Sequence, residues 1–189
     1  MAFYTTNTVR SRGLTAAASS RFTLEERRRK AAIAPNWERF DVFLSHSFRD
    51  AEEIYGVVAI LEDQGLSVYV DWIVDRHLSR GNVTPATAAT LRRRMGQCNS
   101  LIFAVSGTSS ESRWMPWELG LFDGMRGGHI AVMPLLSSAS AQSHPGQEYL
   151  GLYPAVEAPG GPYGSPTVNP REYGVVASGQ SLGAWAKAV

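Results

Sequence analysis

Short apolar runs alternate with amphipathic segments along the middle of the chain, between residues 40 and 136. Apolar positions in the intervening segments recur every three or four residues, which is typical of helices. The apolar runs, each long enough for one strand, are residues 40–45, 66–72, 100–106 and 130–136. Because these predicted strands are apolar nearly throughout and are separated by helices, we expect a parallel sheet covered on both faces. Right-handed crossovers then predict an α/β fold with a flavodoxin-like, doubly wound parallel sheet.

Helix start and stop signals support this alternation. Asp50 is placed to cap the helix after the first strand, and Gly65 is placed to end it. Thr84 and Pro85 begin the next helix, which we expect to run to about Gln97. The third helix is predicted within residues 110–128, where an apolar stripe is formed by Trp114, Trp117, Leu121 and Phe122.

Two extensions flank the predicted domain, which we place at residues 37–158. Residues 1–36 form an N-terminal extension with one helix signal, the capping box of Thr23 and Glu26. Its segment 10–22 is rich in Arg, Ser and Ala and lacks acids, as in an organelle transit peptide; we favour a mobile tail. Residues 159–189 form a Gly/Pro-rich tail that we expect to be loop, with a possible terminal helix docking Leu182 and Trp185.

Composition narrows the class of protein. Apolar residues make up 44% and charged residues 19% of the chain, as in ordinary globular domains. The net charge of +1 gives no global attraction to nucleic acid or to an anionic membrane. The single cysteine, Cys98, excludes an internal disulfide, and we expect it to be an inert apolar side chain. Without a secretion signal or a membrane-length apolar run, the chain is expected to be cytoplasmic.

Polar and aromatic residues gather where the predicted strands end. In open parallel sheets, ligands bind beyond the carboxyl ends of the strands. The candidate binding residues at this rim are Ser45, His46, Phe48, Asp71, Trp72, Ser106 and Trp114, and Glu118 follows on the third helix. Glu118 lies on or beside the apolar stripe of that helix, and glutamate is seldom buried unless it is paired. It therefore either points to solvent or lines a cleft that uses its charge.

Three motifs resemble the TIR (Toll and interleukin receptor) domain family, and especially its bacterial members. "FDVFLSHSFRD" is similar to the family's first box, and "VYVDW" with "LSRGNVTP" resembles the second strand and the BB loop, with Gly81 at its glycine. "SESRWMPWELG" resembles the third helix, in which Trp-x-x-x-Glu-Leu holds the glutamate of NAD-cleaving members. Met115 stands where those members frequently have cysteine. The resemblance covers about residues 40–136 in the family's order.

The resemblance implies an enzyme that cleaves NAD between nicotinamide and ribose, with Glu118 as the catalytic residue. NAD is then the substrate, and no metal ion or further cofactor is implied. The implied role is antiphage defence, with a nucleotide product read by a downstream effector, and no nucleic acid or membrane partner. The polar loop 73–84 is expected to mediate self-association. The alternatives are a non-catalytic TIR interaction module and another flavodoxin-like nucleotide-binding protein.

One glutamate is chemically sufficient for this reaction. Hydrolysis of an O-glycoside typically needs two carboxyl groups, one of which protonates the leaving group. Nicotinamide leaves a cationic pyridinium as a neutral pyridine and needs no acid. A carboxylate beside the ribose supplies the opposite charge for an oxocarbenium-like transition state. Aromatic walls at Phe48, Trp72 and Trp114 would exclude water, which favours a cyclic ADP-ribose isomer over linear ADP-ribose.

Each candidate residue also has an ordinary structural explanation. Trp114 is nearly as well explained by core packing as by ligand stacking, and Trp117 is predicted to be core. His46 more often shapes the first loop in this family than transfers protons, and Asp71 can simply cap its loop. The run 92–94 of arginines is predicted to be a solvated helix face.

Overall fold

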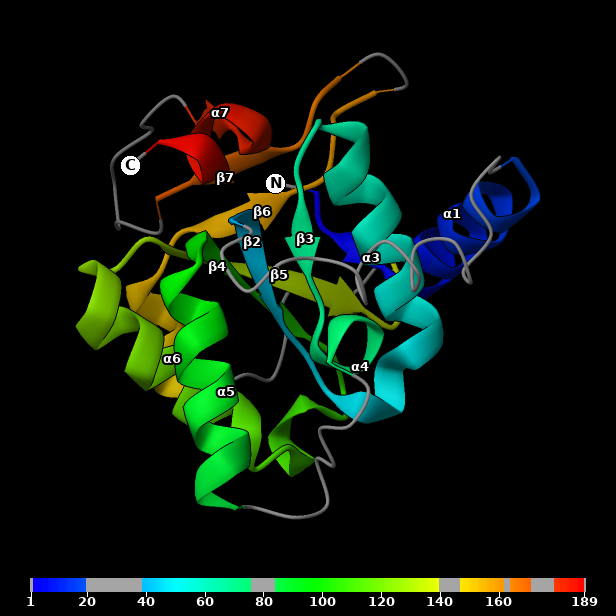
Figure 1. Ribbon diagram of the computed structural model, residues 1–189. Helices are drawn as coiled ribbons and strands as arrows, with labels where there is room; N and C mark the ends of the chain where they lie inside the picture. The colour runs from blue at the N-terminus through cyan, green and yellow to red at the C-terminus, as the bar shows by residue number, and fades with distance from the viewer. Residues whose placement is uncertain are drawn as a thin grey trace.

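The computed structural model describes residues 2–19, 39–75, 84–139, 147–161, 164–170 and 179–188. The capping box at Thr23 and Glu26, Gly81 and residues 76–83 of the polar loop lie outside these ranges. A central sheet runs through the described part of the chain, with helices packed on both of its faces (Figure 1).

Five strands form the parallel part of the sheet in the spatial order β3-β2-β4-β5-β6. Their bounds are β2 Phe40–Ser45, β3 Val68–Tyr69, β4 Cys98–Val105, β5 Ile130–Leu136 and β6 Ala155–Glu157. Numbered from β2, this order is 2-1-3-4-5, which is the order of the flavodoxin-like fold. The predicted α/β fold class is therefore confirmed.

Further strands extend the sheet at the β6 edge. β7 (Thr167–Asn169) pairs antiparallel with β6, and β8 (Gln180–Ser181) pairs antiparallel with β7. The expectation that the Gly/Pro-rich segment is loop is thus wrong for β7, because the ladder to β6 supplies its backbone partners. The terminal helix is present as α7 (Leu182–Lys187), with Leu182 buried.

The first residues of the chain also join the sheet. β1 (Tyr4–Thr5) pairs parallel with the end of β5, beyond the point where β6 pairs with it. α1 (Thr6–Ser19) follows and packs on α3, so the prediction of a mobile tail is wrong for the described residues through Ser19. Composition suggested a tail because α1 has few apolar residues; one of them, Val9, is wholly buried.

Helices divide between the two faces of the sheet (Figure 1). On one side, α3 (Ala51–Asp63), α1 and α7 share a core with Val42 and Leu44 of β2. On the other, α5 (Pro85–Gly96) and α6 (Trp114–Arg126) share a core with Phe43. Because side chains alternate along a strand, Ser45 is expected on the α6 side and His46 on the α3 side.

The second predicted strand is shorter than expected. Only Val68–Tyr69 pairs with β2, and the chain then turns into a short helix, α4 (Asp71–Val74). The backbone N–H of Val74 donates to the carbonyl of Val70 at 2.9 Å, which begins this turn. A short apolar run does not distinguish a strand from a buried helical turn, which explains the error. Gly65, with φ of 70°, ends α3 as predicted.

None of the helices in the described ranges combines the length and the apolar character needed to cross a membrane.

Candidate active site

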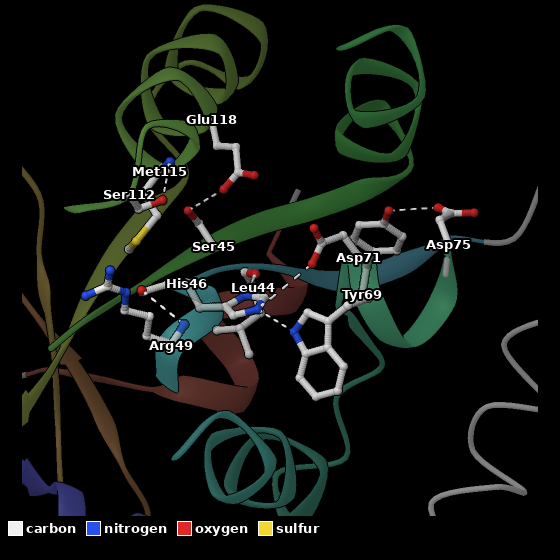
Figure 2. A network of polar contacts seen from close by, with 12 residues as sticks. Leu44, Ser45, His46, Arg49, Tyr69, Asp71, Asp75, Ser112, Met115 and Glu118 are labelled. Carbon is white, nitrogen blue, oxygen red and sulfur yellow. Dashed lines mark hydrogen bonds and ion pairs between the residues drawn. The ribbon is translucent and has the colours of Figure 1, made fainter. Parts of the chain in front are cut away.

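Ser45 and Glu118 meet between the end of β2 and the second turn of α6. The Ser45 hydroxyl donates a hydrogen bond to Oε2 of Glu118 at 2.6 Å (Figure 2). Both residues are 0% exposed. The strand alternation that turns Phe43 toward α6 turns Ser45 the same way, so Ser45 faces the helix that carries Glu118. A hydroxyl donor to a buried carboxylate stabilises its charged form.

The burial of Glu118 excludes one of the two alternatives that the sequence left open, namely a side chain that points to solvent. It belongs to a helix face whose other residues are buried and apolar: Trp114, Met115, Leu119 and Phe122. Glu118 therefore does not point to solvent. An ionised carboxylate among apolar side chains is expensive, and such groups are concentrated at functional sites.

Trp114 is 7% exposed and packs in the same core as Phe122. Its ring meets that of Trp117 edge-on, with 5.3 Å between centroids. Trp117 is only partly buried, and the guanidinium of Arg92 lies 5.6 Å from the centroid of its ring. The prediction that Trp117 is core is thus only partly met, and Trp114 is the more enclosed of the two indoles.

His46 is fixed by a hydrogen bond at each ring nitrogen. Nδ1 lies 2.9 Å from the carbonyl oxygen of Leu44, and Nε2 accepts from the indole N–H of Trp72 at 2.6 Å. Because Nε2 accepts, the pattern assigns the neutral tautomer with the proton on Nδ1, donated to Leu44. Asp71 lies 3.9 Å from Nε2. Both ring nitrogens of His46 are engaged in holding neighbouring groups.

Asp71 and Trp72 lie on α4, not on a strand, and adjoin His46. Asp71 is buried, and Trp72 is partly buried against the α3 side of the core. The ring of Tyr55 meets that of Trp72 edge-on, at 5.1 Å between centroids. His46 and Tyr55 together hold the Trp72 indole at the carboxyl end of the sheet.

Ser106 forms a third polar group with Asp50. Its hydroxyl donates to Oδ2 of Asp50, and the hydroxyl of Thr108 donates to Oδ1 at 2.8 Å. Asp50 stands at the N-cap position of α3, but its side chain makes no capping hydrogen bond. The predicted capping role is therefore wrong, because the loop after β4 supplies two hydroxyl donors that take the carboxylate instead.

Phe48 stands apart from these groups. It begins the short helix η1 (Phe48–Asp50), and it is 62% exposed. Apart from Phe48 and Trp114, the predicted rim residues thus form three local groups: Ser45 with Glu118, His46 with Trp72 and Asp71, and Ser106 with the helix residue Asp50. Among the described residues, no group of three or more His, Cys, Asp or Glu side chains is placed to hold a metal ion.

Comparison with known proteins adds evidence on ancestry. No protein-family model matches the chain. Over 117 residues it is 54% identical to "Probable 3' cyclic ADP-D-ribose synthase ThsB'" of Bacillus cereus strain MSX-D12, a match covering 62% of this chain and 60% of that protein. Over 85 residues it is 33% identical to "Putative cyclic ADP-D-ribose synthase TIR2" of Cytobacillus dafuensis, covering 44% and 22% respectively. The matches span less than two thirds of either relative.

The resemblance to the TIR family is confirmed. The flavodoxin-like strand order agrees with it. Within this TIR-type fold, the three quoted motifs supply β2 with its loop, β3 with α4, and the first half of α6.

A buried network outside the predicted site residues joins α4 to α5. Arg94 donates to Oδ2 and Oδ1 of Asp75 at 2.8 and 2.9 Å, and the Tyr69 hydroxyl donates to Oδ2 at 2.7 Å. The hydrogen bond to Asp75 raises the pKa of Arg94, while burial and the nearby Asp75 carboxylate raise the pKa of Tyr69. Arg94 is 4% exposed, so the prediction of a solvated face is wrong for it.

Sequence reasoning missed this network because its partners are distant in sequence. Asp75 lies near the start of the polar loop 73–84, and Arg94 lies 19 positions later, on α5. The sequence did offer one signal for this network, an acidic residue (Asp75) near the start of the loop followed by a basic residue (Arg94) on the next helix. Cys98 is buried as expected, and its thiol donates to the carbonyl of Arg94 at 3.2 Å.

Proposed function

We propose that this chain is a TIR-type enzyme that cleaves the nicotinamide–ribose bond of NAD and forms a cyclic ADP-ribose isomer. The proposal rests on one observation above others, the buried Glu118 carboxylate held by Ser45 at the carboxyl end of the sheet. The printed names of both relatives, which are cyclic ADP-D-ribose synthases, support the same reaction.

The proposed reaction uses Glu118 as a countercharge. As the bond between C1′ of the ribose and the ring nitrogen breaks, its electron pair goes to nicotinamide, which leaves neutral. Positive charge then develops on the ribose, and the Glu118 carboxylate stabilises it. Ser45 holds one carboxylate oxygen in place, so the charge is oriented before the reaction begins.

Attack on C1′ by an oxygen nucleophile completes the reaction. A hydroxyl of the same molecule attacks C1′ and loses its proton, which Glu118 accepts, and the product is a cyclic isomer; attack by water gives linear ADP-ribose. Tethering favours the internal hydroxyl where water is excluded. We assign Trp72 and Trp114 as the aromatic walls that exclude water; Phe48, which is 62% exposed, does not serve as one in the described structure.

The remaining rim residues have supporting roles in this proposal. His46 positions Trp72 and transfers no proton, because both of its ring nitrogens hold neighbouring groups. Asp71 and Ser106 line the substrate site beside it.

Self-association through loop 73–84 forms the active assembly. The length and polarity of this loop in the sequence support the assignment, because such loops on a rigid scaffold often carry function. Activity should therefore rise more steeply than linearly with protein concentration. We place the protein in the cytoplasm, where its product acts as an antiphage signal read by a downstream effector.

One observation favours a second candidate function, a non-catalytic TIR interaction module. Glu118 is wholly buried in the described structure, as a carboxylate with a purely structural role would be. Catalysis requires that substrate reach it.

Incubation of the purified protein with NAD separates these candidates. We expect nicotinamide release, with a product lighter than ADP-ribose by one water in mass spectrometry. Linear ADP-ribose alone from the earliest times would overturn cyclisation. No nicotinamide release at any protein concentration would favour the interaction module.

A further inference from the structure

An exposed ion pair crosses the rim beside the proposed active site. Arg49 of η1 pairs with Glu111 of η2 (Ser109–Glu111), and their side chains are 67% and 52% exposed. The two short helices lie close after the neighbouring strands β2 and β4. The pair therefore bridges two loops at the carboxyl edge where ligands of such sheets bind.

The backbone of Arg49 is anchored while its guanidinium is accessible. Its N–H donates to the hydroxyl of Ser47 at 3.4 Å, which ties it to the residue two positions after Ser45 (Figure 2). On its other side, Glu111 directly precedes the segment that begins α6, the helix of Glu118. The Arg49–Glu111 pair thus links the two segments that supply the Ser45–Glu118 pair.

A pyrophosphate bound at this rim would need a cationic partner. Three buried acidic residues already lie there, Asp50, Asp71 and Glu118. They suit a cationic nicotinamide-ribose but repel the two negative charges of a pyrophosphate. Arginine binds phosphate oxygens through a planar, bidentate fork of donors.

Arg49 can also leave Glu111 readily for another anion, because their ion pair is exposed. Surface ion pairs contribute little to stability, because water screens them and two long side chains must be ordered. A pyrophosphate offers Arg49 more charge and a better geometric match than the single carboxylate of Glu111 does.

We propose that Arg49 binds the pyrophosphate of the substrate, displacing Glu111, which occupies the guanidinium when no substrate is bound. This inference rests on the proposed function, because it takes NAD as the substrate. Arg49 is then a specificity-determining residue, which selects dinucleotides over nicotinamide riboside.

Calorimetric titration with ADP-ribose and with adenosine tests this without requiring turnover. We expect Arg49→Ala to weaken ADP-ribose binding at least about tenfold and to leave adenosine binding unchanged. Arg49→Lys should retain part of the affinity, and Glu111→Gln should match or exceed the wild type. The matched control is Arg93→Ala, an exposed arginine on α5. In turnover, Arg49→Ala should raise KM for NAD while kcat stays close to that of the wild type.

Several results would overturn the role of Arg49. They are unchanged ADP-ribose affinity in Arg49→Ala, an equal loss for adenosine, a wild type that does not bind ADP-ribose, or an equal loss of ADP-ribose affinity in the control Arg93→Ala. Failure of the proposed function is distinct: ADP-ribose binding that depends on Arg49, without nicotinamide release, would sustain the site and refute the catalysis.

Discussion

Glu53 on α3 and Glu118 on α6 are both buried, on helices that cover opposite faces of one sheet, but their partners differ in kind. Glu53 is 5% exposed and receives the guanidinium of Arg10 from α1 at 2.6 Å. Glu118 receives the neutral hydroxyl of Ser45. A guanidinium offsets the negative charge of its partner carboxylate, whereas a hydroxyl orients a carboxylate without adding a positive charge.

The difference separates a packing role from a chemical one. Glu53 belongs to the α1–α3 interface, where Arg12 also makes a bidentate contact with Asp63 at 2.6 and 2.9 Å. Glu118 lies at the carboxyl end of β2, where this fold binds ligands. We therefore expect changes around Glu53 to alter stability, and changes around Glu118 to alter turnover.

The largest effect on stability is expected from Gly56→Ala, which attacks the α1–α3 interface. A Cβ at Gly56 would lie 1.7 Å from the carbonyl oxygen of Val9, so the two helices must separate. We expect a loss of about 3 kcal/mol or more in the free energy of unfolding, measured by urea denaturation. Gly124→Ala on α6 is the control, because its Cβ meets nothing within 4 Å. Equal stability of the two variants would contradict the observed packing of α1.

Ser45→Ala tests the role assigned to Glu118, because it removes the hydroxyl that donates to the Glu118 carboxylate. Removing the hydroxyl takes a hydrogen bond from a buried carboxylate, which we expect to cost about 1.5–3 kcal/mol. Turnover of NAD should fall as well, because the carboxylate loses its fixed orientation. Ser45→Thr keeps a hydroxyl and should recover part of both. Wild-type kcat in Ser45→Ala would show that Ser45 does not orient the catalytic group.

Glu53→Gln should have a smaller effect, on stability alone. The variant loses the charge opposite Arg10, whose side chain is 48% exposed, so solvent screening limits the loss to about 1 kcal/mol. The kcat for NAD, corrected for the folded fraction, should equal that of the wild type. A fall in kcat comparable to that of a site variant would remove the distinction between the two glutamates.

The smallest effect is a pH dependence at the docking site of α7. Burial lowers the pKa of His129, and its hydrogen bond to the backbone carbonyl of Trp185 partly opposes this shift. The His129 ring also stacks on the Trp185 ring, with 4.4 Å between centroids. The unfolded chain, with its higher pKa near 6.5, then binds more protons than the folded chain. This contribution is complete above that pKa and is lost as the pH falls through the lower, folded pKa. His129→Gln should flatten the pH dependence of thermal stability below about pH 6.5, and an unchanged slope in that range would exclude this contribution.

Much of the fold was accessible from local patterns. The apolar runs predicted β2, β4 and β5, and the Thr84 and Pro85 signals predicted the start of α5. β3 was overestimated because its apolar run continues into α4, and α1 was missed because its packing depends on α3.

Contacts within the site were less predictable than the rim itself. The strand ends placed Ser45 and Glu118 in one region, but their hydrogen bond spans 73 positions and depends on how α6 docks. Asp50 failed as a cap for the same reason, because its donor Thr108 is 58 positions away. Local propensity describes what a side chain can do with its neighbours in sequence, and tertiary packing supplied other partners.

Nicotinamide release by Glu118→Gln, measured beside the wild type at saturating NAD, tests the central claim most directly. The amide keeps the shape of the side chain and still accepts from Ser45, so the fold should be retained, as circular dichroism can verify. Because the countercharge acts mainly in the transition state, kcat should fall at least about 100-fold with little change in NAD binding. A folded Glu118→Gln protein that turns over NAD at the wild-type rate would contradict the assignment of Glu118 as the catalytic residue.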